Sequence, residues 1–254
     1  MITDSFDVES KALIDPQNVV KKDIAEKYGF CPDVIILTFS KEMLNELIEL
    51  GEIEIIGKDL TVGNNKEYPV CRVKGTNIGI SLTIIGEQMA TAAIEELHAL
   101  FGCKKFILFG SCGALIDIEE GKLIVPTEAY RDEGVSYHYA EPADYIKISK
   151  AEKLIEIFNN VGADYVKGKT WTTDAFFRET ENNRNRRINE GCICVEMEVA
   201  GLQAVCDFRG IEFYPFLYGA DSLAGDWTKR ILGDREIDYQ LVFFYLAKKV
   251  AERV

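Results

Sequence analysis

Three apolar runs limit the folds that this chain can adopt. They cover residues 34–37, 106–109 and 213–218, and each has the length of a strand. A strand that is apolar at nearly every position is typical of a sheet buried on both faces by helices. Helical patterns separate these runs, so strands and helices alternate along the chain. The sequence therefore predicts an α/β protein.

The remaining elements follow from turn residues and apolar periodicity. Further strands are expected at 53–56, 68–73, 78–85, 123–125, 165–171 and 192–195. Helices are expected at 41–50, 86–101, 149–158, 197–208 and near the C-terminus. No internal repeat or low-complexity linker interrupts them. We expect residues 32–254 to form one α/β domain, preceded by a polar N-terminal arm at 1–31.

Composition excludes some partners. The net charge of −13 argues against a nucleic-acid backbone or an anionic membrane surface as the main partner. The seven cysteines include no CxxC pair, which indicates reduced thiols. The first ten residues are polar and acidic, unlike a signal peptide, and no apolar run is long enough to cross a membrane. We expect a cytoplasmic protein. With two histidines and no spaced ligand set, we expect no metal site.

The segment 192–201 changes from a strand-like to a helix-like pattern, and two carboxylates lie at the junction. Glu196 and Glu198 are two residues apart, so on an extended backbone they point to the same side. Ionised carboxylates accept hydrogen bonds, and the vicinal hydroxyls of a polyol donate them. The pair therefore predicts a sugar-binding site, with Met197 between its two acids. The alternative is a solvated helix N-terminus, where acids are also favoured.

Two other strand ends carry candidate residues. Gly110, Ser111 and Gly113 follow a buried strand and predict a tight turn with open backbone N–H groups, suited to an anion or a sugar. Asp221 follows the apolar run 213–218 and is a candidate general acid, or a turn aspartate. His138 lies in a polar loop, where it is a candidate lid or contact to a neighbouring subunit, or has no catalytic role.

These segments, in this order and spacing, resemble the nucleoside phosphorylases of the hexameric purine nucleoside and uridine phosphorylase superfamily. The resemblance covers about residues 32–250, and the sequence VEME at 195–198 is its most specific part. The loop around His138 looks like that of the uridine phosphorylase branch. The resemblance implies a mixed, partly barrel-like β-sheet flanked by helices. It also implies a homo-oligomer that is built from dimers and can reach a hexamer.

The resemblance also implies roles for single residues. Glu198 would bind the ribose 2′ and 3′ hydroxyls beside Glu196, Met197 would pack on the sugar, and Phe176 would lie against the base. His138 would belong to the nucleoside site. Ser111 with Gly110 would contact phosphate, a co-substrate, and no cofactor is implied. Asp221 would protonate a purine leaving group at N7, with Arg235 (or Arg230) as its partner.

The phosphate end departs from the family pattern. Phe39, Met43 and Leu108 occupy positions where the family has a glycine and two arginines for phosphate. We name four candidate substitutes, which are Lys41, Arg72, Arg131 and Arg178. Glu87 and Glu42 lie near this end and are candidate bases that would activate water.

Four functions stay open at this point. The first is phosphorolysis of a nucleoside, with a purine favoured because uridine phosphorylases lack the aspartate at position 221. The second is uridine phosphorolysis, which the His138 loop favours. The third is hydrolysis by a nucleosidase, and the fourth is nucleoside binding without catalysis.

Overall fold

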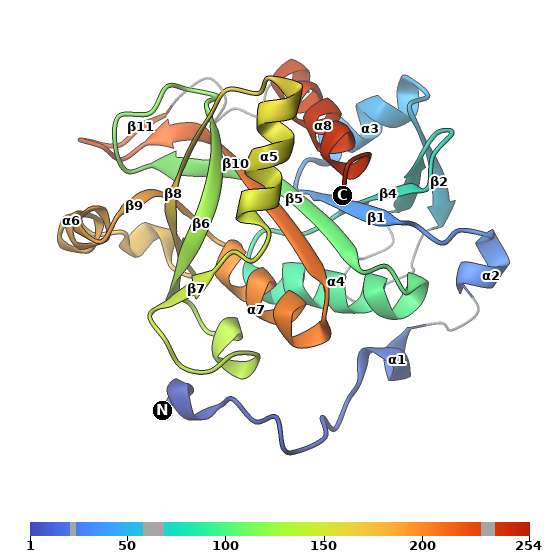
Figure 1. The fold of residues 1–254 in the computed structure, drawn as a ribbon, viewed down its shortest axis with the longest axis horizontal. Helices are drawn as coiled ribbons and strands as arrows, with labels where there is room; N and C mark the ends of the chain where they lie inside the picture. The colour runs from blue at the N-terminus through green and yellow to red at the C-terminus, as the bar shows by residue number, and fades with distance from the viewer. Residues whose placement is uncertain (21–23, 58–68, 230–236) are drawn as a thin grey trace.

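The computed structural model describes residues 1–20, 24–57, 69–229 and 237–254. Its strands form a single eleven-stranded mixed sheet (Figure 1). The strands are β1 (Val34–Thr38), β2 (Ile53–Gly57), β3 (Val70–Val73), β4 (Ile78–Leu82), β5 (Lys105–Ala114), β6 (Leu123–Asp132), β7 (Tyr145–Lys147), β8 (Tyr165–Thr173), β9 (Cys192–Glu196), β10 (Glu212–Ser222) and β11 (Thr228–Lys229).

Part of the sheet closes on itself. Strand β10 pairs with β6, which pairs with β8, then β9, then β5, and β5 pairs again with β10. Three pairs of this ring are parallel (β6–β8, β8–β9 and β5–β10) and two are antiparallel (β6–β10 and β5–β9). Strands β1, β4, β3 and β2 extend the sheet beyond β5. The predicted mixed, partly barrel-like sheet is confirmed.

Helices cover both sides of the sheet. In Figure 1, α4 and α7 lie along one side, and α3, α5 and α8 lie along the other. The helices are α1 (Pro16–Val19), α2 (Ile24–Tyr28), α3 (Lys41–Glu49), α4 (Glu87–Phe101), α5 (Ala151–Val161), α6 (Glu181–Asn189), α7 (Val199–Arg209) and α8 (Ile237–Ala251), with short 3-10 turns η1 (Ile2–Asp4), η2 (Val135–His138) and η3 (Phe176–Arg178).

Local sequence signals explain several of these boundaries. Strands β1 and β4 are buried at every position, as continuous apolar runs require. Helix α3 begins after Ser40, whose hydroxyl accepts a hydrogen bond from the Met43 N–H at 3.1 Å. Helix α4 ends at Gly102, which has a φ of +67° that favours glycine. These two helix ends agree with the sequence-based expectation.

Two local expectations are wrong. The segment from Gly110 to Gly113 is not a turn, because β5 continues through it to Ala114 and pairs with both β10 and β9. A Cβ on Gly113 would lie 2.4 Å from the Leu223 side chain, so this glycine permits close packing rather than a tight turn. Helix α6 was not expected within the polar segment 172–190. The sequence Gly63-Asn64-Asn65 also predicts a turn, and these three positions lie outside the described residues.

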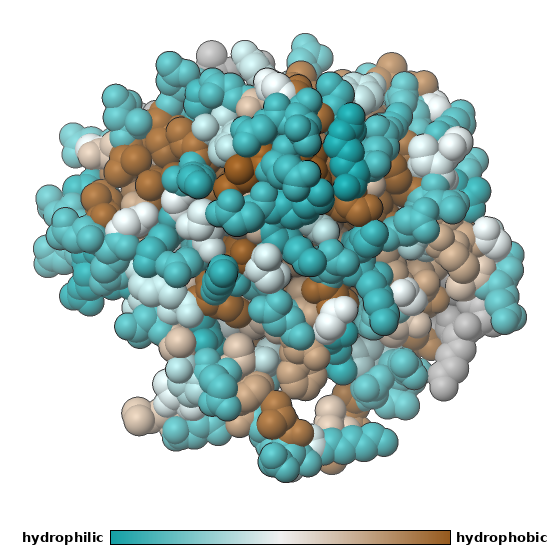
Figure 2. All heavy atoms as spheres, viewed as in Figure 1, coloured by the Kyte–Doolittle hydropathy of each residue, from teal (hydrophilic) through white to brown (hydrophobic). Residues whose placement is uncertain are grey.

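The N-terminal arm runs along one edge of the domain. Turn η1 contacts η2, and α1 contacts α4. Figure 2 shows a largely hydrophilic face, with hydrophobic side chains exposed along the lower edge where the arm lies. Leu13 and Ile14 of this arm are fully or largely exposed. Among the described residues, no helix combines the length and the apolar character needed to cross a membrane.

Candidate active site

One cavity of about 720 Å³ opens where strand ends meet, and its size suits a small-molecule ligand. Strands β1, β5, β9 and β10 each contribute residues to its wall. Seven of the residues to which the resemblance gives a role share this wall. They are Gly110, Ser111, Phe176, Glu196, Met197, Glu198 and Asp221. The structure therefore brings together segments that are about a hundred residues apart in the chain.

The two glutamates of the VEME segment occupy different environments. Glu196 ends β9 and is buried, and its carboxylate accepts four hydrogen bonds. Two come from the hydroxyls of Thr170 and Thr172, and two come from the N–H groups of Glu198 and Val199, both at 2.7 Å. Burial raises the pKa of Glu196, and these donors oppose that rise. Glu196 thus holds the start of α7 in place.

Glu198 keeps more of its hydrogen-bonding capacity. Its Oε1 atom accepts a hydrogen bond from the Gly86 N–H at 2.7 Å, which joins the start of α7 to the start of α4. Burial and the nearby charge of Glu196 raise the pKa of Glu198 to about 8. A carboxylate in this position is suited to accept hydrogen bonds from ligand hydroxyls.

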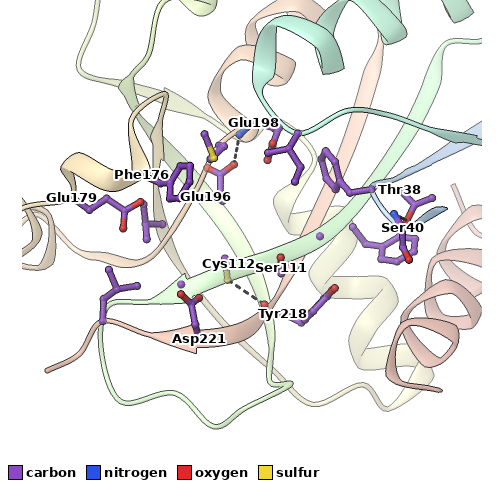
Figure 3. A pocket seen from close by; sticks show the side chains of 18 of the residues that line it. Thr38, Ser40, Ser111, Cys112, Phe176, Glu179, Glu196, Glu198, Tyr218 and Asp221 are labelled. Atoms are coloured by element: carbon purple, nitrogen blue, oxygen red, sulfur yellow. Dashed lines mark hydrogen bonds between the residues drawn. The ribbon is translucent and has the colours of Figure 1, made fainter. Parts of the chain in front are cut away.

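A second acidic pair lies at one end of the cavity. Figure 3 shows Phe176, Glu179 and Asp221 towards this end, and Thr38 and Ser40 towards the other. Asp221 accepts a hydrogen bond from the indole N–H of Trp227 at 2.9 Å. Burial, followed by the negative charge of Asp221, raises the pKa of Glu179 to about 7.

The opposite end carries hydroxyls rather than cations. Thr38 and Ser40 lie at this end, and Ser111 lies nearer the middle of the cavity (Figure 3). Of the residues that the structure describes, no lysine or arginine lines the cavity. Arg131 is buried elsewhere, where it donates hydrogen bonds to the Ser136 hydroxyl and the Glu141 carbonyl. The other three suggested substitutes, Lys41, Arg72 and Arg178, are also absent from the cavity wall.

Several predicted site residues lie away from the cavity. His138 is exposed in η2 and borders a separate groove next to the N-terminal arm. Glu42 is exposed in the first turn of α3. Glu87 is fully buried, and its pKa is raised to about 11 by burial and by Glu133. A carboxyl that keeps its proton at neutral pH does not activate water, so Glu87 does not meet the requirement for that role.

The last predicted catalytic residue, Arg235, and its alternative Arg230 lie outside the described residues. The proposed pairing of either arginine with Asp221 stays a prediction. The wall also contains residues that the sequence reasoning missed, above all Glu179 and Trp227. Neither residue directly follows a strand predicted from the sequence, and candidate residues were expected at the ends of such strands. Trp227 stands six residues after Asp221, in the loop that was expected to carry the catalytic acid.

The amino-acid sequence matches a known protein family. The sequence matches the model of the Phosphorylase superfamily over residues 33–241, which is most of the chain. The chain belongs to this superfamily. The match covers the strands of the closed ring and every residue of the cavity wall discussed above.

Curated relatives within the superfamily include several phosphorylases. The chain is 31% identical to a guanosine phosphorylase of Halorubrum lacusprofundi, over 59% of this chain and 64% of the relative. It is 32% identical to a DeoD-type purine nucleoside phosphorylase of Shewanella oneidensis, over 53% and 58%. It is 38% identical to a uridine phosphorylase of Thermococcus kodakarensis, over 42% and 39%. The chain thus spans less than two thirds of the length of these relatives.

Solved structures extend the likeness in fold to most of the chain. An AMP nucleosidase from Bacteroides thetaiotaomicron has a TM-score of 0.66 at 19% identity, covering 93% of this chain and 99% of that one. A futalosine hydrolase of Helicobacter pylori has a TM-score of 0.67 at 18% identity, covering 87% and 98%. At this identity the likeness concerns the fold alone.

Proposed function

We propose that this protein cleaves the N-glycosidic bond of a purine nucleoside, with inorganic phosphate as the nucleophile. The observation that carries the proposal is the position of two acidic groups in one cavity, with Glu198 on the wall near α4 and Asp221 at the far end of β10. Phosphorylases among the curated relatives support the choice of reaction. No cofactor is required by this chemistry.

Glu198 would hold the ribose. Its carboxylate accepts hydrogen bonds from the 2′ and 3′ hydroxyls, and Met197 packs on the sugar. Two hydroxyl donors favour the ionised form of the acid, so binding would lower the raised pKa of Glu198. The sugar develops positive charge as the bond to the base breaks, and a neighbouring carboxylate stabilises that charge.

The base would lie at the end of the cavity that carries Glu179 and Asp221, against the ring of Phe176. As the C1′–N9 bond breaks, its electron pair moves to the base while a phosphate oxygen forms the new bond to C1′. A proton delivered to N7 neutralises the charge on the base, which makes it a better leaving group. Asp221 lies at this end, and Ser111 with Gly110 would contact phosphate.

Hydrolysis is the second candidate, and one observation favours it. Among the described residues the cavity wall contains four carboxylates and no cation. Carboxylates oppose the binding of a phosphate dianion, whereas they do not oppose water. The missing phosphate arginines at positions 43 and 108 agree with this second reading.

The discriminating experiment measures cleavage of inosine, adenosine, guanosine and uridine, with and without phosphate. We expect purine nucleosides to be cleaved only with phosphate present, giving ribose 1-phosphate and free base. A full rate in phosphate-free buffer, with ribose as product, would replace phosphorolysis by hydrolysis. Binding of nucleosides without any product would contradict both reactions and indicate a binding protein.

A further inference from the structure

Glu179 lies between η3 and α6 and reaches the same end of the cavity as Asp221. It is only partly exposed, in contrast to Phe176 and Phe177 beside it, which are 49% and 87% exposed. Its pKa is raised to about 7 by burial and by the negative charge of Asp221, so the two acids are close enough to influence each other. Both acids thus line the same end of the cavity.

Hydrogen bonds distinguish the two acids. Asp221 accepts the indole N–H of Trp227 at 2.9 Å, and a donor of this kind stabilises an ionised carboxylate. Within the described part of the chain, no side chain donates a hydrogen bond or forms a salt bridge to the carboxyl of Glu179. A protonated Glu179 can therefore direct its O–H at a ligand, whereas the Oδ2 atom of Asp221 already accepts a hydrogen bond from the protein.

The charged groups around the pair leave this difference in place. On α6, Arg184 donates to the carbonyl oxygens of Leu223 at 3.0 Å and Gly225 at 2.8 Å, and thereby holds the loop after β10. Arg178, Asp226 and Lys229 are exposed, and none of them lines the cavity. Lys229 on β11 is the register partner of Asp221 on β10, so the nearest strand places a cation on the side of Asp221. Across the cavity lie Glu196 and Glu198, whose negative charge also favours a proton on the pair.

We propose that Glu179 and Asp221 together bind the base of the nucleoside, and that Glu179 is the acid that gives its proton to the leaving base. The proposal rests on the function proposed above and assigns the proton transfer to a different residue. The O–H bond of Glu179 breaks and an N–H bond forms on the base as the C1′–N9 electron pair moves into the ring. Glu179 becomes a carboxylate and takes a new proton from solvent after the products leave.

The test compares the Glu179→Gln variant with wild type on two substrates, inosine and 7-methylguanosine. The base of 7-methylguanosine already carries a positive charge, so its departure does not need an acid. We expect kcat for inosine to fall by about 100-fold or more, because general acid catalysis typically contributes about 10²–10⁴-fold. The loss on 7-methylguanosine should be at least about tenfold smaller. Glu181→Gln, which changes a side chain that is 79% exposed on α6, is the matched control and should behave as wild type.

The pH dependence gives a second readout. With Glu179 as the acid, kcat/KM of wild type for inosine should fall as the pH rises above about 7, where this group loses its proton in the free enzyme. The Asp221→Asn variant removes a charge that raises the Glu179 pKa, so its alkaline limb should move to lower pH. In Glu179→Gln the limb at this pH should be absent.

Three results would overturn the inference. The first is cleavage of inosine by Glu179→Gln at the wild-type rate. The second is an equal fall in kcat on inosine and on 7-methylguanosine. The third is an alkaline limb that is unchanged in this variant. Thermal unfolding of the variant shows whether a loss on both substrates comes from misfolding. If it does, the pH profile of Asp221→Asn tests the inference instead, and an unshifted alkaline limb would contradict it. If wild type cleaves no purine nucleoside at all, the proposed function fails together with the inference. If wild type cleaves inosine and Glu179→Gln matches it, only the inference fails.

Discussion

At the scale of single residues, two glutamates that are two positions apart in sequence have different roles. The carboxylate of Glu196 is used by four hydrogen-bond donors of the protein itself, whereas Glu198 receives one from the Gly86 N–H. The helix-terminus hypothesis applies to Glu196, although this residue is buried rather than solvated. The sugar-binding hypothesis stays a prediction for Glu198. Glu196 supports the helix start, and Glu198 is the acid available to a sugar.

The Glu198→Gln variant should weaken nucleoside binding by about 1–3 kcal/mol, because a charge-assisted hydrogen bond to a ribose hydroxyl becomes a neutral one. Its stability should change little, since a glutamine oxygen still accepts the Gly86 N–H. The variant Glu196→Gln should show the reverse. It loses about 1–3 kcal/mol of unfolding free energy, because its amide has one acceptor oxygen in place of the two carboxylate oxygens that receive four donors. Isothermal titration and urea unfolding measure the two effects, and wild-type affinity in Glu198→Gln would remove this residue from the site.

At the scale of elements, helices α4 and α7 meet around a buried carboxyl. Glu87 in the first turn of α4 packs on Gly201 of α7, where an added Cβ would lie 2.4 Å from Glu87 Oε2. Glu87 Oε1 accepts the Val135 N–H at 3.1 Å, and the nearby carboxyl of Glu133 helps to raise the pKa of Glu87. This carboxyl therefore joins the two helices to η2, and it does so in its protonated form.

The pKa of Glu87 predicts how stability depends on pH. Its value rises from 4.5 to about 11 on folding, so the folded chain binds a proton that the unfolded chain releases. The stabilisation is full below pH 4.5 and is lost as the pH rises towards 11. Glu87→Gln imitates the protonated acid, and it should match wild type near pH 5 and be more stable near pH 9. Thermal unfolding at both values checks this, with the exposed Glu42→Gln as control. Parallel curves for Glu87→Gln and wild type would contradict the prediction.

The sequence predicted the positions of helices and strands more accurately than it predicted the contacts between distant residues. Apolar runs located the buried strands because burial on both faces leaves a local signal, as β1 shows. The end of β5 was missed because Gly110 and Gly113 favour turns in isolation, and only pairing with β9 and β10 keeps them extended. Helix α6 was missed because its sequence is polar and has no apolar stripe. Glu179 was missed because its link to Asp221 joins residues that are distant in the chain.

At the scale of the whole molecule, the core of the domain begins before residue 32, the boundary that the sequence predicts. Phe30 is buried beneath α4, where its ring meets Phe101 edge-on with centroids 5.7 Å apart. The Arg72 guanidinium lies over the same ring, 4.6 Å from its centroid. Phe30 therefore belongs to the core, whereas Leu13 and Ile14 are exposed. We therefore predict that residues 1–15, which precede α1, are dispensable for folding.

A variant without residues 1–15 should unfold cooperatively, with a Tm within about 4 °C of the full chain, because the removed side chains bury little surface. It should also keep the cleavage activity, since no residue of this segment lines the cavity. Phe30→Ala should instead cost about 3–5 kcal/mol, because it leaves a void in the core, and this loss corresponds to a fall in Tm of about 6 °C or more. Calorimetry on the three proteins compares these values. If the truncation costs as much as Phe30→Ala, the arm is an integral part of the domain, and the closed ring with its helices does not fold independently of it.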